Sequence, residues 1–303
     1  MNQRRFHGVV PPTITALTAD EQLDRAGMAR LVEHQIEGGV HGLFVLGTNG
    51  EGPCLTDRVR REVCEVAVET ARGRVPVIAG VLQPSTARII EDMRLLRDTG
   101  IEAFVATTPY YFGGYSEDEL VGHYRRLADA SDLPVMIYNI PQNTKVPVKA
   151  SAVFKIAEDP RIVGVKDSSG DWAEVQRMLL ERPREDFVIL QGNQQMSAIS
   201  LLLGADGLVP GFANVYPSLL TQMYAAATRG DAAEALAIQA KVDGFIRIRG
   251  RASLHGTKLL AAHLGLIEPN LTSPLPRMTP AETDRYLSAC LAAGFPTRET
   301  ASA

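Results

Sequence analysis

Residues 135–167 read VMIYNIPQNTKVPVKASAVFKIAEDPRIVGVKD. The stretch contains two apolar, β-branched runs, residues 135–139 and 162–167, which are typical of buried strands. The segment between the runs has helical character, so the stretch predicts a strand, a helix and a second strand. Such a unit requires two parallel strands joined by a right-handed crossover.

The rest of the chain repeats this unit. Thr56 or Asp57 is expected to cap one of the intervening helices, and Ser85 or Thr86 another. Eight strand–helix units in a chain of 303 residues predict an α/β protein, and they favour a closed (β/α)8 TIM barrel over an open doubly wound sheet. The six further strands are expected at residues 8–12, 43–47, 77–80, 103–108, 187–192 and 207–211.

The strand pattern stops after residue 211. Helices are expected beyond it, and one of them completes the barrel; they cover residues 216–229, 232–249, 257–264 and 280–293. We therefore predict a (β/α)8 barrel with the active site over residues 1–225, followed by a C-terminal helical appendage over residues 226–303.

The composition indicates an ordinary soluble globular protein. Hydrophobic residues make up 45% of the chain and charged residues 22%, and the net charge of −4 argues against a nucleic-acid-binding surface. No apolar stretch is long enough to span a membrane. The three cysteines, Cys54, Cys64 and Cys290, form no CxxC pair, so a reducing cytoplasm is the expected location.

The sequence lacks the motifs of common cofactor sites. The six histidines show no HxH or HExxH spacing, so no metal site is expected. No GxGxxG fingerprint or GxSxG elbow occurs, which leaves dinucleotide binding and a serine hydrolase without support. We therefore expect no cofactor.

Lys166 is the first candidate for catalysis. Catalytic groups of such barrels lie at the C-terminal ends of the strands, and Lys166 ends an apolar strand in a chain with six lysines against 25 arginines. A desolvated lysine has a lowered pKa, and its neutral amine can attack a ketone to form a Schiff base. A structural lysine paired with a carboxylate is the alternative, and the pattern alone does not separate the two.

Two further strand ends carry candidate groups. Tyr138 ends the neighbouring strand, where its phenol could exchange protons with a Schiff base or simply fill the core. Residues 47–51, GTNGE, offer backbone N–H groups that suit a small carboxylate. Tyr111 follows the fourth strand and is either an interface anchor or a proton relay.

Five motifs occur in the order and at the spacing of a known family. Together they resemble the dihydrodipicolinate synthase and N-acetylneuraminate lyase family of pyruvate-dependent class I aldolases. The similarity extends from about Phe6 to at least Gly294. The motifs are GTNGE at 47–51, TTPYY at 107–111, YNIP at 138–141, GVKDSSGD at 164–171 and GLVPGFANV at 207–215.

The resemblance implies a role for each catalytic candidate. Lys166 would form the Schiff base with pyruvate or another 2-keto acid, and Tyr138 would shuttle protons. Thr48 would link Tyr138 to Tyr111, which would reach in from a neighbouring subunit. The family is usually a tetramer, a dimer of dimers, so a homotetramer is expected.

The resemblance also implies the substrate contacts. The carboxylate of the keto acid would lie on the backbone of Thr48 and Asn49, and the backbone at Gly192 and Val209 would border the site. Small-molecule 2-keto acids and aldehydes are thus the expected partners.

Departures from the family pattern bear on the aldehyde. Dihydrodipicolinate synthases usually carry GTTGE, and an arginine two residues after the proline of their YNxP motif binds the distal carboxylate of aspartate semialdehyde. This chain has Asn49 and Asn143 at these two positions. An amide does not replace a bidentate guanidinium for a carboxylate. Sialic acid lyases have an acidic pair where this chain has Gln194 and Gln195. The amides of Asn143, Gln194 and Gln195 are candidates for binding substrate hydroxyls.

The predicted activity is a Schiff-base lyase that makes or cleaves a C–C bond between pyruvate and an aldehyde, within a 2-keto-3-deoxy sugar acid or a 4-hydroxy-2-oxo acid. One alternative is 4-hydroxy-tetrahydrodipicolinate synthase, and another is a 2-keto-3-deoxy acid dehydratase. A non-catalytic protein that binds keto acids is a third. A barrel enzyme that binds phosphate after strands 7 and 8 is a fourth.

Overall fold

A computed structural model describes residues 5–248 and 253–295. It contains one sheet of eight parallel strands in the order β1-β8-β7-β6-β5-β4-β3-β2. All eight predicted strands are present, and the central four match their predicted limits within one residue. The strands are β1 Gly8–Val9, β2 Leu43–Val45, β3 Val77–Val81, β4 Ala103–Thr107, β5 Val135–Asn139, β6 Ile162–Asp167, β7 Val188–Gln191 and β8 Gly207–Leu208.

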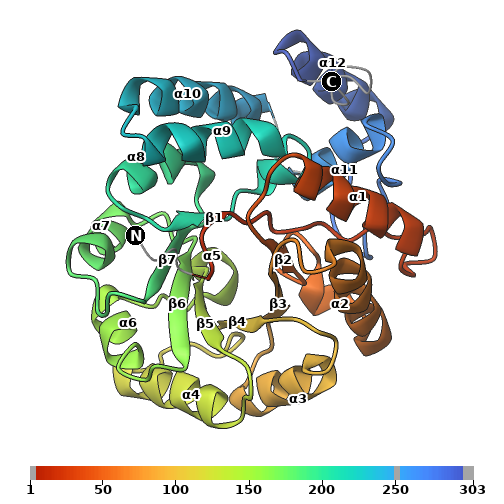
Figure 1. The fold of residues 1–303 in the computed structure, drawn as a ribbon. Coiled ribbons are helices and arrows are strands. Elements are labelled where there is room, and N and C mark those ends of the chain that lie inside the picture. The colour runs from red at the N-terminus through yellow and green to blue at the C-terminus, as the bar shows by residue number, and fades with distance from the viewer. Residues whose placement is uncertain (1–4, 249–252, 296–303) are drawn as a thin grey trace.

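The two edges of the sheet approach each other beyond β1. Pro12 forms a parallel bridge with Phe44 of β2, and the N–H of Phe44 donates to the carbonyl of Pro11 over 3.0 Å. β1 ends before these prolines because proline has no N–H to contribute to a ladder. Figure 1 shows the strands curling around a common axis with the longer helices outside them. The arrangement is consistent with the predicted (β/α)8 barrel.

Helices follow the strands as the sequence predicts. Of the alternative caps, Thr56 caps α2 by accepting a hydrogen bond from Val59 N–H, and Ser85 caps α3 by accepting one from Arg88 N–H. The helices around the sheet are α1 Arg25–Glu37, α2 Asp57–Ala71, α3 Thr86–Leu96, α4 Glu117–Asp129, α5 Pro141–Thr144, α6 Ala150–Ile156, α7 Trp172–Leu180, α8 Ser197–Leu202 and α9 Pro217–Thr228, with short 3-10 turns η1 Gly52–Cys54, η2 Gln194–Met196 and η3 Gly211–Asn214.

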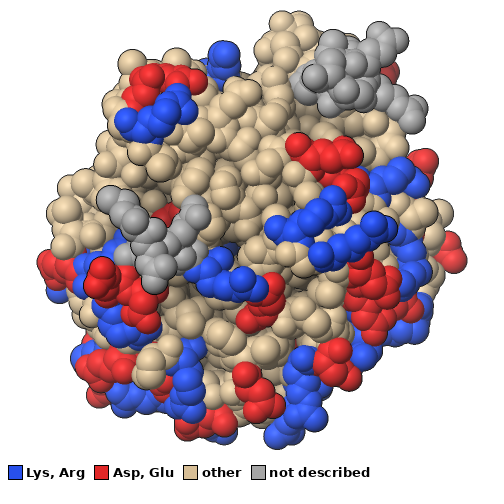
Figure 2. Space-filling view, in the orientation of Figure 1, with Lys and Arg blue, Asp and Glu red and all other residues tan. Residues whose placement is uncertain are grey.

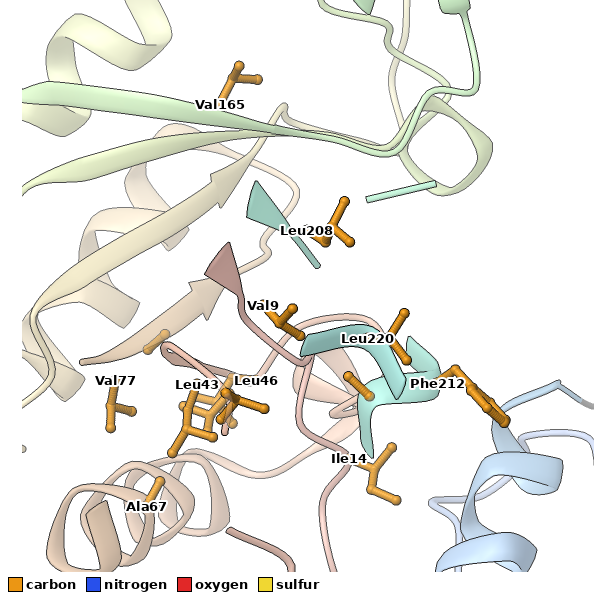
Figure 3. Packing of buried hydrophobic residues seen from close by; sticks show 14 of the residues in the cluster. Val9, Ile14, Leu43, Leu46, Ala67, Val77, Val165, Leu208, Phe212 and Leu220 are labelled. Atoms are coloured by element: carbon orange, nitrogen blue, oxygen red, sulfur yellow. The ribbon is translucent and has the colours of Figure 1, made fainter. Parts of the chain in front are cut away.

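The sheet separates two cores. Phe44 and Tyr138 belong to a cluster inside the barrel, whereas Val9 and Leu208 belong to the larger cluster that includes residues of the surrounding helices. Figure 3 shows part of the larger cluster, with Leu220 of α9 near the β1–β8 seam. The alternation along each strand thus decides which side chains reach the interior.

The C-terminal region is helical, as predicted. α10 Ala232–Ile248 packs against α8 and α9, and α11 Ser253–His263 packs against α12 Pro280–Ala292. In Figure 1, α11 and α12 lie beyond one side of the ring. Residues 249–252 and 296–303 lie outside the described residues, and so does the predicted helix end at residue 249. The division at residues 225 and 226 stays a prediction.

The surface carries both signs of charge. Figure 2 shows Lys and Arg side chains interspersed with Asp and Glu around the face seen in Figure 1. Within the described ranges, no helix has the length and hydropathy needed to cross a membrane.

Candidate active site

Lys166 lies inside the barrel near the end of β6. The strand register places it beside Tyr138 of β5, and the residue is 4% exposed. Its Nζ lies 3.7 Å from the ring centroid of Tyr138 and 4.7 Å from that of Phe44. None of the carboxylates in the described residues forms an ion pair with it, so the structure holds an amine between two aromatic rings without a counter-ion.

This environment changes the chemistry of the Lys166 amine. Burial lowers its pKa well below the ordinary 10.5. The two rings favour the charged form, but a cation–π contact is worth less than the desolvation of a fully buried amine. The neutral, nucleophilic form is therefore more populated near neutral pH than in an exposed lysine.

Tyr138 is hydrogen-bonded through its phenol. The phenol oxygen lies 3.1 Å from Thr48 Oγ1. Burial raises the pKa of Tyr138 to about 12, although the side chains of Thr48 and Ser168 act in the opposite direction. The phenol therefore keeps its proton at neutral pH and can hand it to a stronger base formed during a reaction.

Gly192 and Val209 directly follow the ends of β7 and β8. A Cβ on Gly192 would lie 2.1 Å from Ser168 Oγ and 3.1 Å from Lys166 Cε, so no larger residue fits beside the lysine. Val209 is buried in the interior cluster that also contains Tyr138. Both predicted border positions are thus part of the barrel interior near its C-terminal end.

A cavity of about 330 Å³ opens beside Thr48. Of the two asparagines predicted to contact substrate, Asn143 lies on the wall of this cavity and Asn49 is not among its lining residues. The backbone N–H groups of Thr48 and Asn49 donate to no other described residue. The lining includes Thr48, Thr107, Tyr110, Asn143, Leu254 and Leu275.

Tyr111 is not part of this cluster in a single chain. It is 87% exposed, its backbone is left-handed with φ 81°, and its ring packs edge-on against that of Phe112. The hydrogen-bonded pair of Tyr138 and Thr48 therefore ends without Tyr111. The structure brings Lys166, Tyr138 and Thr48 together and leaves Tyr111 outside.

Comparison with known proteins identifies the family of this chain. Residues 5–292 match the model of the dihydrodipicolinate synthetase family. The chain belongs to this family. A 4-hydroxy-tetrahydrodipicolinate synthase from Phenylobacterium zucineum is 37% identical over 296 residues, which cover 96% of this chain and 98% of the relative.

Solved structures of the dihydrodipicolinate synthetase family agree with this assignment. The dihydrodipicolinate synthase of Bacteroides thetaiotaomicron superimposes with a TM-score of 0.90 at 34% identity and covers 96% of this chain and 100% of its own. A prophage protein of the family from E. coli K12, solved in complex with pyruvate, gives a TM-score of 0.91 at 26% identity and covers 96% and 99%. The chain is thus a lyase of the pyruvate-dependent class I aldolase type.

This family member supports its GTNGE loop with a buried ion pair that the sequence analysis did not anticipate. Glu51 has φ 58°, and its carboxylate lies 2.5 Å from Lys258 Nζ of α11, with neither side chain exposed. The same carboxylate accepts hydrogen bonds from the N–H and hydroxyl of Thr272, both over 2.7 Å. The C-terminal region thereby holds the loop that carries Thr48.

Two of the predicted amides lie elsewhere. The side-chain oxygen of Gln194 accepts a hydrogen bond from Phe212 N–H over 2.7 Å, and Gln195 is exposed. Neither is among the residues that line the cavity. Within the described parts of the chain, no three His, Cys, Asp or Glu side chains gather as a metal site would require.

Proposed function

We propose that this enzyme forms a Schiff base between Lys166 and the C2 carbonyl of pyruvate, and that it makes or cleaves a C–C bond to an aldehyde. One observation carries the proposal: the Lys166 amine is buried beside Tyr138 with no ion-pair partner among the described residues. A lysine that served only structure at this depth would need a counter-ion to offset its desolvation.

The steps follow from the positions of these groups. The neutral amine of Lys166 attacks C2, and loss of water from the carbinolamine gives the imine. Removal of a proton from C3 gives an enamine, which attacks the aldehyde carbon; cleavage runs in reverse. Tyr138 gives its proton to the departing carbinolamine hydroxyl, and the resulting phenolate takes the proton from C3 and passes it to the aldehyde oxygen; hydrolysis of the imine at the end of the cycle returns the proton to the phenolate. Thr48 keeps the phenol oriented through the 3.1 Å contact.

The carboxylate of pyruvate has donors nearby. We assign it to the backbone N–H groups of Thr48 and Asn49, which have no acceptor among the described residues. Gly192 borders the keto acid because it lies against Lys166, and Val209 borders it from the cluster that contains Tyr138. No metal ion or cofactor takes part in this proposal.

Borohydride reduction in the presence of pyruvate tests the proposal. An imine at Lys166 would be reduced to a stable adduct, which intact mass and peptide mapping locate. Lys166→Ala is the matched control and should give no adduct. Folded wild-type protein that gives no adduct, with pyruvate or with larger 2-keto acids, would favour the non-catalytic alternative.

The aldehyde has two candidates. The name of the Phenylobacterium relative, 4-hydroxy-tetrahydrodipicolinate synthase, favours aspartate semialdehyde, and the comparisons give this alternative more support than a sugar acid or 4-hydroxy-2-oxo acid. The neutral amide of Asn143 on the cavity wall favours an uncharged aldehyde, because it offers no charge to a carboxylate. Turnover of pyruvate with aspartate semialdehyde, and separately with glyceraldehyde, decides between them.

Assembly is part of the proposal. Tyr111 and Phe112 are 87% and 72% exposed, and we propose that Tyr111 completes the relay to Thr48 of a second copy in a homotetramer. A gel-filtration mass gives the test, because a fully active monomer would exclude this role. A cytoplasmic location also stays a prediction.

A further inference from the structure

Thr107, the last residue of β4, has a hydroxyl without a partner. Its Oγ1 is buried and forms no hydrogen bond with any described residue, and the residue is 1% exposed. Burying a hydroxyl without a hydrogen bond is unfavourable, and most buried polar atoms in native proteins are paired. A buried, unpaired hydroxyl on a residue that lines a cavity is therefore available to a polar group of a bound ligand.

The Thr107 side chain faces the barrel interior. Ala103 and Val105 of β4 belong to the interior cluster, whereas Phe104 and Ala106 belong to the outer one. Side chains alternate along a strand, so residue 107 continues the inward series. Thr107 also lines the cavity beside Thr48, whose lining residues do not include Lys166 or Tyr138.

Thr107 stands in one row with the proposed catalytic groups. It pairs with Tyr138 in the register of β4 and β5, and Tyr138 pairs with Lys166 in the register of β5 and β6. Three neighbouring strands thus present a hydroxyl, a phenol and an amine at the same level. Neighbouring strands of a sheet lie about 4.8 Å apart, so a substrate attached to Lys166 that extends past Tyr138 extends towards Thr107.

The other hydroxyls of the described cavity wall are already engaged. Thr48 Oγ1 bonds to the Tyr138 phenol, Thr144 Oγ1 donates to a backbone carbonyl over 3.2 Å, and Tyr110 donates to a carbonyl over 3.4 Å. Thr107 is the one left for a ligand. Pyruvate does not need it, because Lys166 takes C2 and the loop at Thr48 takes the carboxylate.

We propose that Thr107 binds the oxygen of the aldehyde half of the substrate. This oxygen is the aldehyde carbonyl before the C–C bond forms and the C4 hydroxyl of the keto acid afterwards. The inference rests on the proposed Schiff base at Lys166, and it holds for either candidate aldehyde because both carry this oxygen.

The proposed contact is to the oxygen on which negative charge develops during the reaction. When enamine C3 attacks the aldehyde carbon, the π pair of the carbonyl moves to its oxygen, which takes a proton from Tyr138. In cleavage, the C4 hydroxyl returns its proton as the C3–C4 bond breaks and the carbonyl re-forms. Thr107 gains and loses no proton; its hydroxyl donates a hydrogen bond to the oxygen where negative charge develops.

Borohydride trapping with a pair of keto acids tests the contact without knowledge of the natural aldehyde. The pair is 4-hydroxy-2-oxopentanoate and 2-oxopentanoate, which differ only in the C4 hydroxyl. The half-saturating concentration of each is measured from the trapped mass, with pyruvate released by cleavage counted as adduct of the hydroxylated acid. Wild-type protein should prefer the hydroxylated acid by about fivefold, the contribution of one ordinary hydrogen bond.

Neighbouring threonines supply matched variants. Thr107→Val should abolish the preference, and Thr107→Ser should keep it. Thr108→Val makes the same chemical change one residue later, where Thr108 Oγ1 donates to the Val146 carbonyl over 3.2 Å; it should keep the preference and lower the melting temperature. Thr107→Val should not lower the melting temperature, because it removes an unpaired hydroxyl.

The outcomes separate this inference from the proposed function. Wild-type protein that traps pyruvate but shows no preference between the two pentanoates overturns the role of Thr107. A preference that survives in Thr107→Val, or disappears equally in Thr108→Val, overturns it as well. Loss of every adduct, pyruvate included, from folded wild-type protein is instead the failure of the Schiff base itself.

Discussion

Lys166 in the barrel and Lys258 in α11 are both buried, but their surroundings differ. Lys258 lies 2.5 Å from the Glu51 carboxylate and donates to the Asn270 carbonyl. Lys166 has two aromatic rings around its amine and no ion pair among the described residues. The same side chain thus appears once with a counter-ion and once without.

The difference shows that a buried lysine can serve either structure or chemistry, depending on whether it has a counter-ion. Burial lowers the pKa of both amines, but Glu51 acts against this effect at Lys258, whereas burial alone is the cause at Lys166. A paired lysine remains a cation and joins two segments of chain. An unpaired one is available as a neutral nucleophile.

Replacing Lys166 gives the largest expected effect. Lys166→Met should abolish the pyruvate adduct and lower turnover by at least about a thousandfold, because no other group replaces the nucleophile. Its free energy of unfolding should not fall, since an uncompensated buried amine is removed. Borohydride trapping and urea unfolding measure the two effects.

The control for Lys166→Met is Lys155→Met, which removes a half-exposed lysine that pairs with Glu117 on the surface. This variant should keep the adduct and change stability by less than about 1 kcal/mol. A pyruvate adduct that persists in Lys166→Met would contradict the assignment of the nucleophile.

Replacing Lys258 should mainly lower stability, whereas replacing Lys166 mainly lowers turnover. Lys258→Met leaves Glu51 buried without its cation, so the free energy of unfolding should fall by about 3–5 kcal/mol. The double variant Glu51→Gln with Lys258→Met should recover most of this loss. Urea unfolding checks both variants, and a single variant as stable as the wild type would show that the pair has no energetic role.

Taken per unit of pH, the change in stability with pH is the smallest of these effects, and it gives the sharpest distinction between the two lysines. The pKa of Lys166 is lower in the folded than in the unfolded protein, so the unfolded state binds more protons between the two values. Stability therefore rises with pH across that window, by about 1.4 kcal/mol per unit of pH. The stability gained by Lys166→Met should be greatest below the folded pKa and vanish toward the unfolded value of about 10.4.

Urea unfolding of both proteins between pH 6 and pH 10 measures this difference. Subtracting one curve from the other removes the contributions of groups that the two proteins share, Lys258 included. Parallel curves over the whole range would mean that Lys166 titrates like an exposed lysine, and the contrast between the two lysines would fail.

Much of the fold was predictable because its signals are local. Apolar runs with intervening helical periodicity predicted the eight strands, and Thr56 and Ser85 were each one of two residues expected to cap a helix. The limits of β1 were harder to predict. Residues 8–12 are apolar throughout, but the ladder stops at Val9 because Pro11 and Pro12 cannot donate to it.

The candidate site likewise contains residues that the sequence predicts and residues that it does not. Lys166 and Tyr138 end neighbouring strands, so their proximity follows from the parallel order. Thr107 gave no signal of its own, because a threonine suits a strand whether or not its hydroxyl is paired. The contact of Glu51 with Thr272 joins residues 221 positions apart, and no pattern within either segment reports it.

The Glu51–Lys258 pair also limits how such enzymes can be recombined. The catalytic loop comes from the first quarter of the chain, but its supporting cation and the Thr272 donors come from the last. A chimera joined near residue 225 would take the loop with Glu51 from one relative and the residues at 258 and 272 from another. Relatives can therefore exchange their C-terminal helices without loss of the loop only where the acid and the base are inherited together.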